Sequence, residues 1–295
     1  MPNLYFKRSL DIRDRKHLAY RLGASPEYLE ELASRAESLY AFKLEEKKSG
    51  GYREISMPKR ELKGIQKKIE KLLKEVKLHD SANCGIRKKS NFTNAVVHCG
   101  QKWVFSLDFT KFFPNISHHM VYHMFRAYMN CSPAVARLLT RLSTVKEAVP
   151  QGGPMSVSIA NLVCLRLDDR LHNLAGKFSL AYTRYCDDLC FSGSCIPDIF
   201  KDKVRQIVLR SGFFLNSKKE SCTPRHDCQI VTGLCVNRRK PSVPRGKKRH
   251  LRNESFLFNK YESQCLPKQL RQKRQMQIDG KKNYINYVEK AGVSN

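Results

Sequence analysis

The chain has 295 residues, and its 55 Lys and Arg against 27 Asp and Glu give a formal net charge of +28. A hydrophobic content of 41% is enough to form a core, while no run of about 18 apolar residues is present, which excludes a membrane-spanning helix. Because the excess of positive charge is far larger than solubility requires, it predicts a polyanionic partner, with nucleic acid favoured over a membrane surface.

The amino terminus and the cysteines both indicate a reducing environment. The first residues contain no apolar segment typical of a secretory signal, so we expect a cytoplasmic protein. The 11 cysteines are odd in number and include no Cys-x-x-Cys pair. These features favour free thiols over a disulfide framework or a zinc site.

The first hundred residues predict helices that flank a hairpin. Two short helices are expected within the first forty residues. Two strand-like runs at 39–44 and 52–57, separated by the basic and glycine-rich segment 47–51, predict a hairpin with a basic tip. Between 62 and 76 the apolar residues recur every three or four positions, which predicts an amphipathic helix with a lysine-rich outer face.

From residue 103 onward, strands and helices alternate. The expected strands are 103–107, 180–185, 189–192 and 229–236, and the expected helices are 155–174 and 197–210. The first strand ends on Asp108, and the second and third form a hairpin with Asp187 and Asp188 at its tip. Together these elements predict an α+β unit in which helices pack on a sheet.

The last sixty residues are strongly basic. Between Arg238 and Lys290 the sequence has 16 Lys or Arg and only four Asp or Glu, with five Phe or Tyr interspersed. Basic helices that carry aromatic side chains are typical of surfaces that hold nucleic acid. We therefore expect this region to bind the polyanion.

Three aspartates are the candidate catalytic residues. Asp108, Asp187 and Asp188 stand at strand ends, where neighbouring carboxylates repel one another unless a cation neutralises them. Hard divalent ions such as Mg²⁺ prefer carboxylate oxygens, and two such ions about 4 Å apart support in-line phosphoryl transfer. The pair Asp168-Asp169 lies within an expected helix, so we interpret it as part of a solvated helix face.

Five segments together resemble reverse transcriptases, and within them the bacterial retron branch. FSLDFTKFF at 105–113, PQGGPMS at 150–156 and YCDD at 185–188 resemble three polymerase motifs, in the order and spacing of that family. NAVVH at 94–98 and VTGL at 231–234 resemble two motifs typical of the retron enzymes. The resemblance covers about residues 50–236.

This resemblance implies an α+β right-hand polymerase fold, with N-terminal helices and fingers in 1–100, a palm with an antiparallel sheet in 101–236 and a basic helical thumb in 237–295. It implies an RNA-directed DNA polymerase that uses two Mg²⁺ ions and deoxynucleotide triphosphates. The template would be a dedicated structured non-coding RNA, primed from one of its own 2′-OH groups to give branched RNA–DNA. A cytoplasmic bacterial location, antiphage defence with an accessory effector protein, and no membrane partner are also implied.

The resemblance further assigns roles to individual residues of this sequence. The catalytic and metal-binding set consists of Asp108, Asp187, Asp188 and the backbone of Phe109. The nucleotide-binding set consists of Arg53, Phe113, Gln151, Gly152 and Lys218, with Lys219 as an alternative to Lys218. The RNA or primer contacts are Asn94, His98, Thr232, Gly233, Lys247, Lys248 and Arg249. Phe113 matches the steric gate that excludes a ribose 2′-OH.

One residue departs from the family pattern. Cys186 stands between the tyrosine and the aspartate pair, where many relatives have alanine. Its side chain is small enough for the same tight turn, so we expect activity to be retained. We also expect Cys186 either to alter the packing of the primer end or to make the activity sensitive to thiol reagents.

Two alternatives stay open at this point. The first is a reverse transcriptase of a group II intron or of a diversity-generating element, although these lack the paired retron motifs. The second is a non-catalytic RNA-binding scaffold derived from a polymerase. The presence of Asp108, Asp187 and Asp188 disfavours the scaffold, because RNA binding alone does not require three clustered negative charges.

Overall fold

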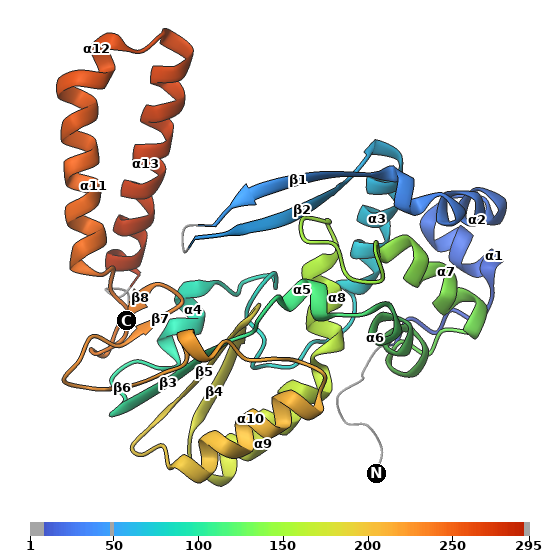
Figure 1. Cartoon of the computed structure of the whole chain (residues 1–295), viewed down its shortest axis with the longest axis horizontal. Coiled ribbons are helices and arrows are strands. Elements are labelled where there is room, and N and C mark those ends of the chain that lie inside the picture. Colours follow the sequence, from blue (N-terminus) through green and yellow to red (C-terminus); the bar gives the residue numbers. More distant parts are fainter. Residues whose placement is uncertain (1–8, 48–49, 292–295) are drawn as a thin grey trace.

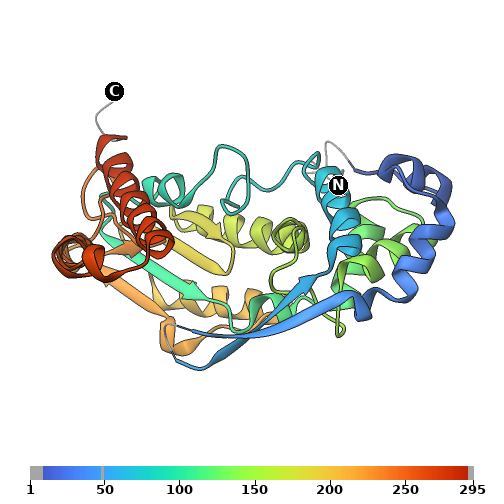
Figure 2. The same cartoon turned by 90° about the horizontal axis from the view of Figure 1, so that it is seen from above.

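The computed structural model describes residues 9–47 and 50–291. Figure 1 shows a sheet with packed helices, a long hairpin above it, and a pair of helices that rises from the carboxyl-terminal end. Figure 2 shows that the N-terminal helices and the C-terminal helical pair lie at opposite ends of the molecule. Within the described residues, no helix combines the length and the apolar character needed to cross a membrane.

The N-terminal elements match the prediction from the sequence except for the short helix α4, which was not predicted. They are α1 (Arg15–Leu22), α2 (Pro26–Ser34), a 3₁₀ turn (Ala36–Leu39), β1 (Tyr40–Glu46), β2 (Tyr52–Pro58), α3 (Arg60–Leu73) and α4 (Asn91–Val96). Ser25 caps α2 by accepting a hydrogen bond from the Tyr28 N–H, and Pro26 takes the first helical position. β1 and β2 pair antiparallel, from Tyr40 opposite Pro58 to Glu46 opposite Tyr52. The expected hairpin is thus confirmed.

A four-stranded antiparallel sheet forms the centre of the molecule. Its strands are β3 (Trp103–Asp108), β4 (Ala181–Tyr185), β5 (Asp188–Gly193) and β6 (Ser221–Pro224), in the order β4-β5-β3-β6. Val104, Phe105 and Leu107 of β3 are buried, in agreement with the apolar run that predicted this strand. The pairing of β6 with β3 was not predicted, because β6 has no apolar alternation and only its partner defines it.

The helices beside the sheet differ from the prediction at one place. They are α5 (Phe112–Asn115), α6 (His118–His123), a π-helical turn (Met124–Tyr128), α7 (Pro133–Ser143), α8 (Ser156–Val163), α9 (Leu165–Lys177) and α10 (Asp198–Arg210). The single helix expected over 155–174 is two helices, because the backbone of Cys164 (φ −79°, ψ 0°) leaves the helical conformation between α8 and α9. A break at one residue leaves the apolar spacing nearly unchanged, so the pattern did not reveal it.

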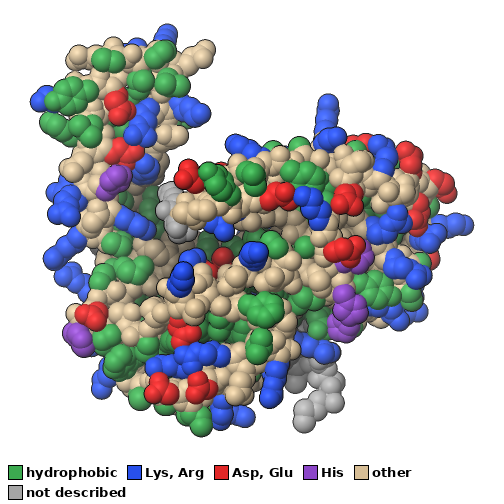
Figure 3. Space-filling view, viewed as in Figure 1, with side chains coloured by type: hydrophobic (Ala, Val, Ile, Leu, Met, Phe, Trp, Pro, Cys, Tyr) green, Lys and Arg blue, Asp and Glu red, His purple; other side chains and the backbone are tan. Residues whose placement is uncertain are grey.

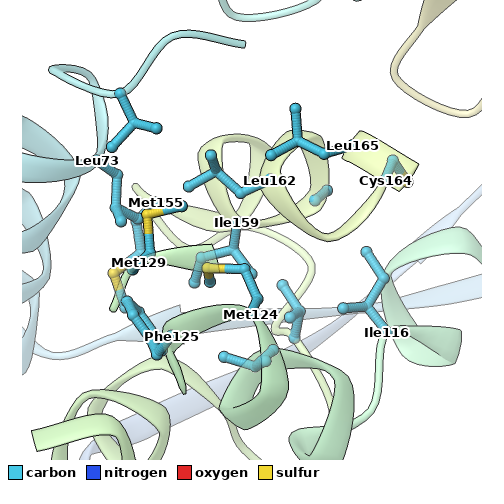
Figure 4. Close-up of a cluster of buried hydrophobic side chains, with 14 of the residues drawn as sticks. Leu73, Ile116, Met124, Phe125, Met129, Met155, Ile159, Leu162, Cys164 and Leu165 are labelled. Carbon is cyan, nitrogen blue, oxygen red and sulfur yellow. The ribbon is translucent and has the colours of Figure 1, made fainter. Parts of the chain in front are cut away.

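One hydrophobic core joins the N-terminal helices to the helices beside the sheet. In Figure 4, Leu73 of α3 lies near Met155, and Phe125 and Ile159 pack from the neighbouring helices. These four side chains are almost fully buried. Because dense cores transmit displacements, this packing fixes the hairpin-bearing segment relative to the sheet.

The carboxyl-terminal region has a second correction. The strand expected over 229–236 is instead a tight hairpin of β7 (Ile230–Val231) and β8 (Leu234–Cys235), turned at Thr232 (φ 45°) and Gly233 (φ 81°). A 3₁₀ turn (Ser217–Lys219) precedes β6, and the helices that follow β8 are α11 (Arg245–Leu257), a π-helical turn (Phe258–Glu262), α12 (Ser263–Cys265) and α13 (Lys268–Lys290). The helical character expected of this basic region is confirmed.

Candidate active site

The three candidate catalytic aspartates meet where β3 and β5 lie side by side. Asp108 is the last residue of β3 and pairs in register with Asp188, the first residue of β5. Asp187 precedes it in the β4–β5 turn, and its carbonyl accepts a hydrogen bond from the Phe109 N–H at 3.1 Å. The sheet thereby brings residues 80 positions apart in sequence to one point.

Figure 3 shows a hollow between the β1–β2 hairpin and the C-terminal helices, with Lys and Arg side chains along its rim.

The carboxylates carry more negative charge than their surroundings neutralise. Burial raises the pKa of the Asp187 carboxyl, and the charge of Asp108 raises it further. Burial, followed by the charges of Asp187 and Asp108, raises the pKa of Asp188 to about 7. Asp188 also shares a side-chain hydrogen bond with Asp108. Carboxylate oxygens of this kind are the donors that a hard divalent cation such as Mg²⁺ prefers. Among the described residues, no group of three or more His, Cys, Asp or Glu is arranged so that it could hold a metal ion.

Lys219 supplies a positive charge at this position. Its Nζ atom lies 2.9 Å from Oδ2 of Asp108, and this hydrogen bond raises the pKa of the ammonium group. Lys218 was the residue predicted to approach the triphosphate, with Lys219 as the alternative. Lys218 is an exposed part of the same 3₁₀ turn, and its N–H donates to Asn216 Oδ1. The structure therefore places the Lys219 ammonium beside Asp108, whereas Lys218 forms its hydrogen bond through the backbone.

A buried ion pair supports the β4–β5 turn, which carries Asp187 and is called the catalytic turn from here on. The guanidinium of Arg184 donates to both carboxylate oxygens of Asp168, at 2.8 and 2.7 Å, and the Tyr182 hydroxyl donates to the same carboxylate. Both side chains are fully buried. Arg184 Nη1 also donates to the carbonyl of Cys186 at 3.1 Å. The interpretation of Asp168 as a solvated residue was wrong, because its partner on β4 could not be recognised from the helix pattern, whereas Asp169 is half-exposed as expected.

Gln151 and Gly152 lie beneath the β1–β2 hairpin. The Ser56 N–H of β2 donates to the Gln151 carbonyl at 2.8 Å. Gly152 has φ +116°, and a Cβ atom there would lie 2.8 Å from Ile55 Cγ2, so only glycine fits without displacing the hairpin. Arg53 lies on the exposed part of β2 and forms an ion pair with Glu45 of β1.

The three phenylalanines that follow Asp108 differ in how deeply their side chains are buried. The Phe109 and Phe112 rings stack at a centroid distance of 5.2 Å, and both side chains are buried. Phe113 is half-buried and packs against Phe112 at 5.4 Å. Phe113 therefore keeps some exposed surface, whereas Phe109 and Phe112 belong to the core.

The two residues expected from the NAVVH segment to contact RNA have different surroundings. His98 is fully buried, and its ring nitrogens form hydrogen bonds of 2.7 Å with Ser192 Oγ and Thr183 Oγ1. Burial lowers the pKa of this imidazole to about 3, so it is neutral at pH 7. The prediction that His98 contacts RNA is wrong for this structure, because the side chain ties α4 to the sheet and has no exposed surface.

Asn94 lines a cavity that also reaches the catalytic turn. The cavity has a volume of about 260 Å³ and is lined by Asn94, Tyr185, Asp188, Thr232 and Gly233, among others. Asn94 Oδ1 is buried and has no hydrogen-bond partner among the described residues. Thr232 Oγ1 donates to the Asn91 carbonyl at 2.9 Å, which fixes the β7–β8 turn against α4. The cavity thus joins the NAVVH and VTGL segments to Asp188.

The three basic residues predicted at the start of the C-terminal region are all on α11. Lys247 Nζ donates to the Gly233 carbonyl at 3.1 Å, and Lys248 pairs with Glu289 of α13 at 2.7 Å. Arg249 is exposed. Lys247 therefore connects α11 to the turn that lines the cavity.

Comparison with known proteins agrees with this geometry. A family model described as reverse transcriptase (RNA-dependent DNA polymerase) matches residues 45–231, and the chain belongs to this family. The expected α+β polymerase fold is thereby confirmed. A solved structure of telomerase from Candida albicans, in a complex with a fragment of telomeric RNA, has a TM-score of 0.48 and 12% identity over 75% of this chain and 50% of that chain.

Within the family, the chain is similar to retron enzymes. It is 31% identical over 203 residues to the retron Ec86 reverse transcriptase of Escherichia coli, covering 68% of this chain and 63% of that protein. It is 33% identical over 230 residues to the retron Se72 reverse transcriptase of Salmonella heidelberg, covering 74% and 60%. The retron Ec83 reverse transcriptase of Escherichia coli is 26% identical over 266 residues, covering 85% and 84%. The chain thus spans less than two thirds of the length of the first two relatives, and the expected resemblance to the bacterial retron branch is confirmed.

Proposed function

We propose that this protein is a retron-type RNA-directed DNA polymerase that copies a dedicated structured non-coding RNA into DNA. The observation that supports this most directly is the convergence of Asp108, Asp187 and Asp188 at the facing ends of β3 and β5. The retron relatives support the choice of branch. Deoxynucleotide triphosphates and the RNA are the substrates, and the chain works in the bacterial cytoplasm.

The aspartates would hold two Mg²⁺ ions, with the backbone carbonyl of Phe109 as a further ligand. When bound, such ions increase the acidity of the attacking hydroxyl and stabilise the negative charge on the leaving oxygen. Lys219, held beside Asp108, would place a positive charge or a proton near the triphosphate. Arg53 would contact the triphosphate after exchanging its Glu45 partner for phosphate oxygens.

Other residues would select and orient the incoming nucleotide. Gln151 and Gly152, which are held against the hairpin by the hydrogen bond to Ser56, would lie against the incoming nucleotide and the template. The half-buried Phe113 ring would exclude a ribose 2′-OH and thus favour deoxynucleotides. The rigid attachment of Phe113 to the buried ring of Phe112 keeps this gate in position.

The cavity beside Asp188 would receive the primer end. Asn94 Oδ1, buried and without a partner in the described chain, can accept a hydrogen bond from a nucleotide hydroxyl or amino group. Thr232 and Gly233 would contact the same nucleotide, and Lys247, Lys248 and Arg249 would bind phosphates of the adjoining strand. Priming from a 2′-OH of the RNA would then yield branched RNA–DNA, and this product would serve antiphage defence together with an accessory effector protein.

A primer-extension assay on the copurified RNA tests the polymerase. The wild type is expected to incorporate deoxynucleotides in the presence of Mg²⁺, and the double variant Asp187→Asn/Asp188→Asn is expected to be silent. Asp169→Asn, which removes a half-exposed carboxylate elsewhere, is the matched control and should stay active. Equal silence of wild type and double variant would leave only the scaffold alternative.

Sequencing of the copurified nucleic acid tests the retron assignment. The expected result is one short structured RNA covalently linked to DNA. An intron RNA, a variable-repeat RNA or random RNA would instead support the group II or diversity-generating alternative.

A further inference from the structure

Two cysteines lie side by side beneath the catalytic turn. Residues 81–83 run parallel to the end of β4: the Arg184 N–H donates to the Ser81 carbonyl at 2.8 Å, and the Asn83 N–H donates to the Arg184 carbonyl at 2.9 Å. This is a parallel bridge between Ala82 and Arg184. Cys84 and Cys186 each follow two residues later, where both segments enter a turn. Parallel neighbours are about 4.8 Å apart, so the two segments enter these turns at a separation within the range of about 4.4–6.8 Å between the Cα atoms of a disulfide.

The two thiols are close enough to affect each other's pKa. Cys84 and Cys186 share a side-chain hydrogen bond, and both residues are partly exposed. The two side chains are therefore close enough for their sulfur atoms to be drawn together into a bond.

The surrounding network holds both backbones in place. Asn161 Nδ2 donates to the Cys84 carbonyl at 2.9 Å, and Arg184 Nη1 donates both to Asn161 Oδ1 and to the Cys186 carbonyl, each at 3.1 Å. One amide and one guanidinium thus tie the two cysteine-bearing segments to the buried Asp168. Because these hydrogen bonds hold the two segments together, the two thiols stay close to each other in the folded protein.

We propose that Cys84 and Cys186 form a reversible oxidation site whose disulfide stops catalysis. With a peroxide as oxidant, one thiol sulfur attacks a peroxide oxygen, the O–O bond breaks and water leaves, so a sulfenic acid forms. The second thiol then displaces the sulfenic oxygen as water and the S–S bond closes. Two thiols lose two electrons and two protons, and one hydrogen peroxide becomes two waters. A dithiol reductant reverses the reaction by thiol–disulfide exchange.

The bond acts on catalysis through the position of Asp187. Cys186 occupies the left-handed region at φ 59°, directly before Asp187 in a turn tied to β3 through the Phe109 N–H. Closing an S–S bond of about 2.05 Å draws the Cys186 side chain toward Cys84 and rotates this turn. A displacement of about 1 Å of a catalytic group costs about 100-fold in rate. The loss of activity rests on the polymerase function proposed above. The disulfide itself can be detected by the mass of the linked peptide whether or not the protein is a polymerase.

A second cysteine pair provides the control. Cys228 and Cys235 have their sulfur atoms 4.0 Å apart, but they lie beyond β6 and at β8, away from the β4–β5 turn. Neither cysteine of that pair belongs to the β4–β5 turn that carries Asp187. The variant Cys228→Ser removes the second pair, and Cys84→Ser and Cys84→Ala each remove the first without changing the turn residue Cys186.

The full chain, together with its copurified nucleic acid, is treated with hydrogen peroxide. One part is digested under non-reducing conditions and examined by mass spectrometry, and primer extension is measured on the other part. We expect a Cys84–Cys186 peptide lighter by two hydrogen atoms, a loss of activity of at least tenfold, and recovery with dithiothreitol. Cys228→Ser should behave as the wild type, while Cys84→Ser or Cys84→Ala should keep its activity in peroxide.

Two outcomes would overturn the proposal. One is the absence of the Cys84–Cys186 peptide from peroxide-treated wild type. The other is an equal loss of activity in the wild type and in both Cys84 variants. If the reduced wild type has no polymerase activity at all, the proposed function fails, and the linked peptide still decides whether the oxidation site exists.

Discussion

Arg184 Nη2 lies 2.7 Å from Asp168 Oδ2, and neither side chain has exposed surface. This ion pair connects α9 to β4, directly before the catalytic turn. Through its other nitrogen the same guanidinium holds the carbonyl of Cys186 and the side chain of Asn161. The pair therefore affects both the stability of the fold and the position of the aspartates.

Removal of one partner of this pair should destabilise the protein strongly. Asp168→Ala leaves the buried guanidinium of Arg184 without its counter-charge, and we expect a loss of about 3–5 kcal/mol in the free energy of unfolding. Denaturant unfolding followed by circular dichroism measures it. The matched control, Asp169→Ala on the next position of α9, should change stability by about 0.5 kcal/mol. Equal losses in the two variants would contradict the role of the pair.

The neighbouring lysines should differ in their effect on catalysis. Lys219→Ala removes the positive charge beside Asp108, and we expect kcat to fall about 100-fold because charge on the triphosphate is no longer stabilised. Lys218→Ala removes an exposed lysine of the same turn and should have little effect on kcat. Steady-state incorporation of deoxynucleotides distinguishes them, and a larger effect of Lys218→Ala would restore the original assignment.

His98 should make the stability of the protein dependent on pH. Its pKa in the folded state is about 3, below the ordinary value of 6.5. As the pH falls below 6.5 the unfolded chain binds a proton that the folded chain does not, so stability is complete above that value and is lost toward pH 3. This one group contributes a slope of up to about 1.4 kcal/mol per pH unit.

The variant His98→Gln should remove this contribution while lowering stability at pH 7. Urea unfolding at several pH values between 4 and 7 measures the slope, with His119→Gln, at an exposed position of α6, as the control. An unchanged slope in His98→Gln would show that the imidazole is not buried in solution.

The basic face of α11 should determine part of the salt dependence of RNA binding. Each phosphate contact contributes about 0.7–0.9 to the slope of log K against log salt concentration. Arg249→Ala, at an exposed position, should lower the slope by about one contact, and Lys177→Ala at the end of α9 should leave it unchanged. Filter binding of the copurified RNA at several salt concentrations gives both slopes. Equal slopes for wild type and Arg249→Ala would exclude this residue from the interface.

The sequence predicted the local elements and the meeting of the aspartates well. Apolar spacing located α3 and β3, and Ser25 with Pro26 marked the start of α2, because these signals are local in the chain. The convergence of Asp108 with Asp188 could be expected because strand ends and a short hairpin turn restrict where carboxylates can lie.

The features that escaped prediction depend on partners distant in sequence. Asp168 was predicted to be a solvated residue, because its partner Arg184 lies on a distant strand. His98 was predicted to contact RNA, because the two strand hydroxyls that bind its ring are also distant in sequence. The choice between Lys218 and Lys219 depended on one turn whose side-chain directions no periodic pattern encodes. In each case the deciding contact forms only after the sheet has assembled.

The shared core of Leu73, Phe125, Met155 and Ile159 (Figure 4) means that the hairpin-bearing segment is not an exchangeable module. A chain divided near residue 100 would expose apolar surface on both fragments, and each fragment alone would tend to aggregate. Mixed together, the two pieces could bury that surface only against each other, as a complemented heterodimer. Chimaeras that swap the hairpin between relatives therefore need to carry α3 and its partners in α7 and α8 as one unit.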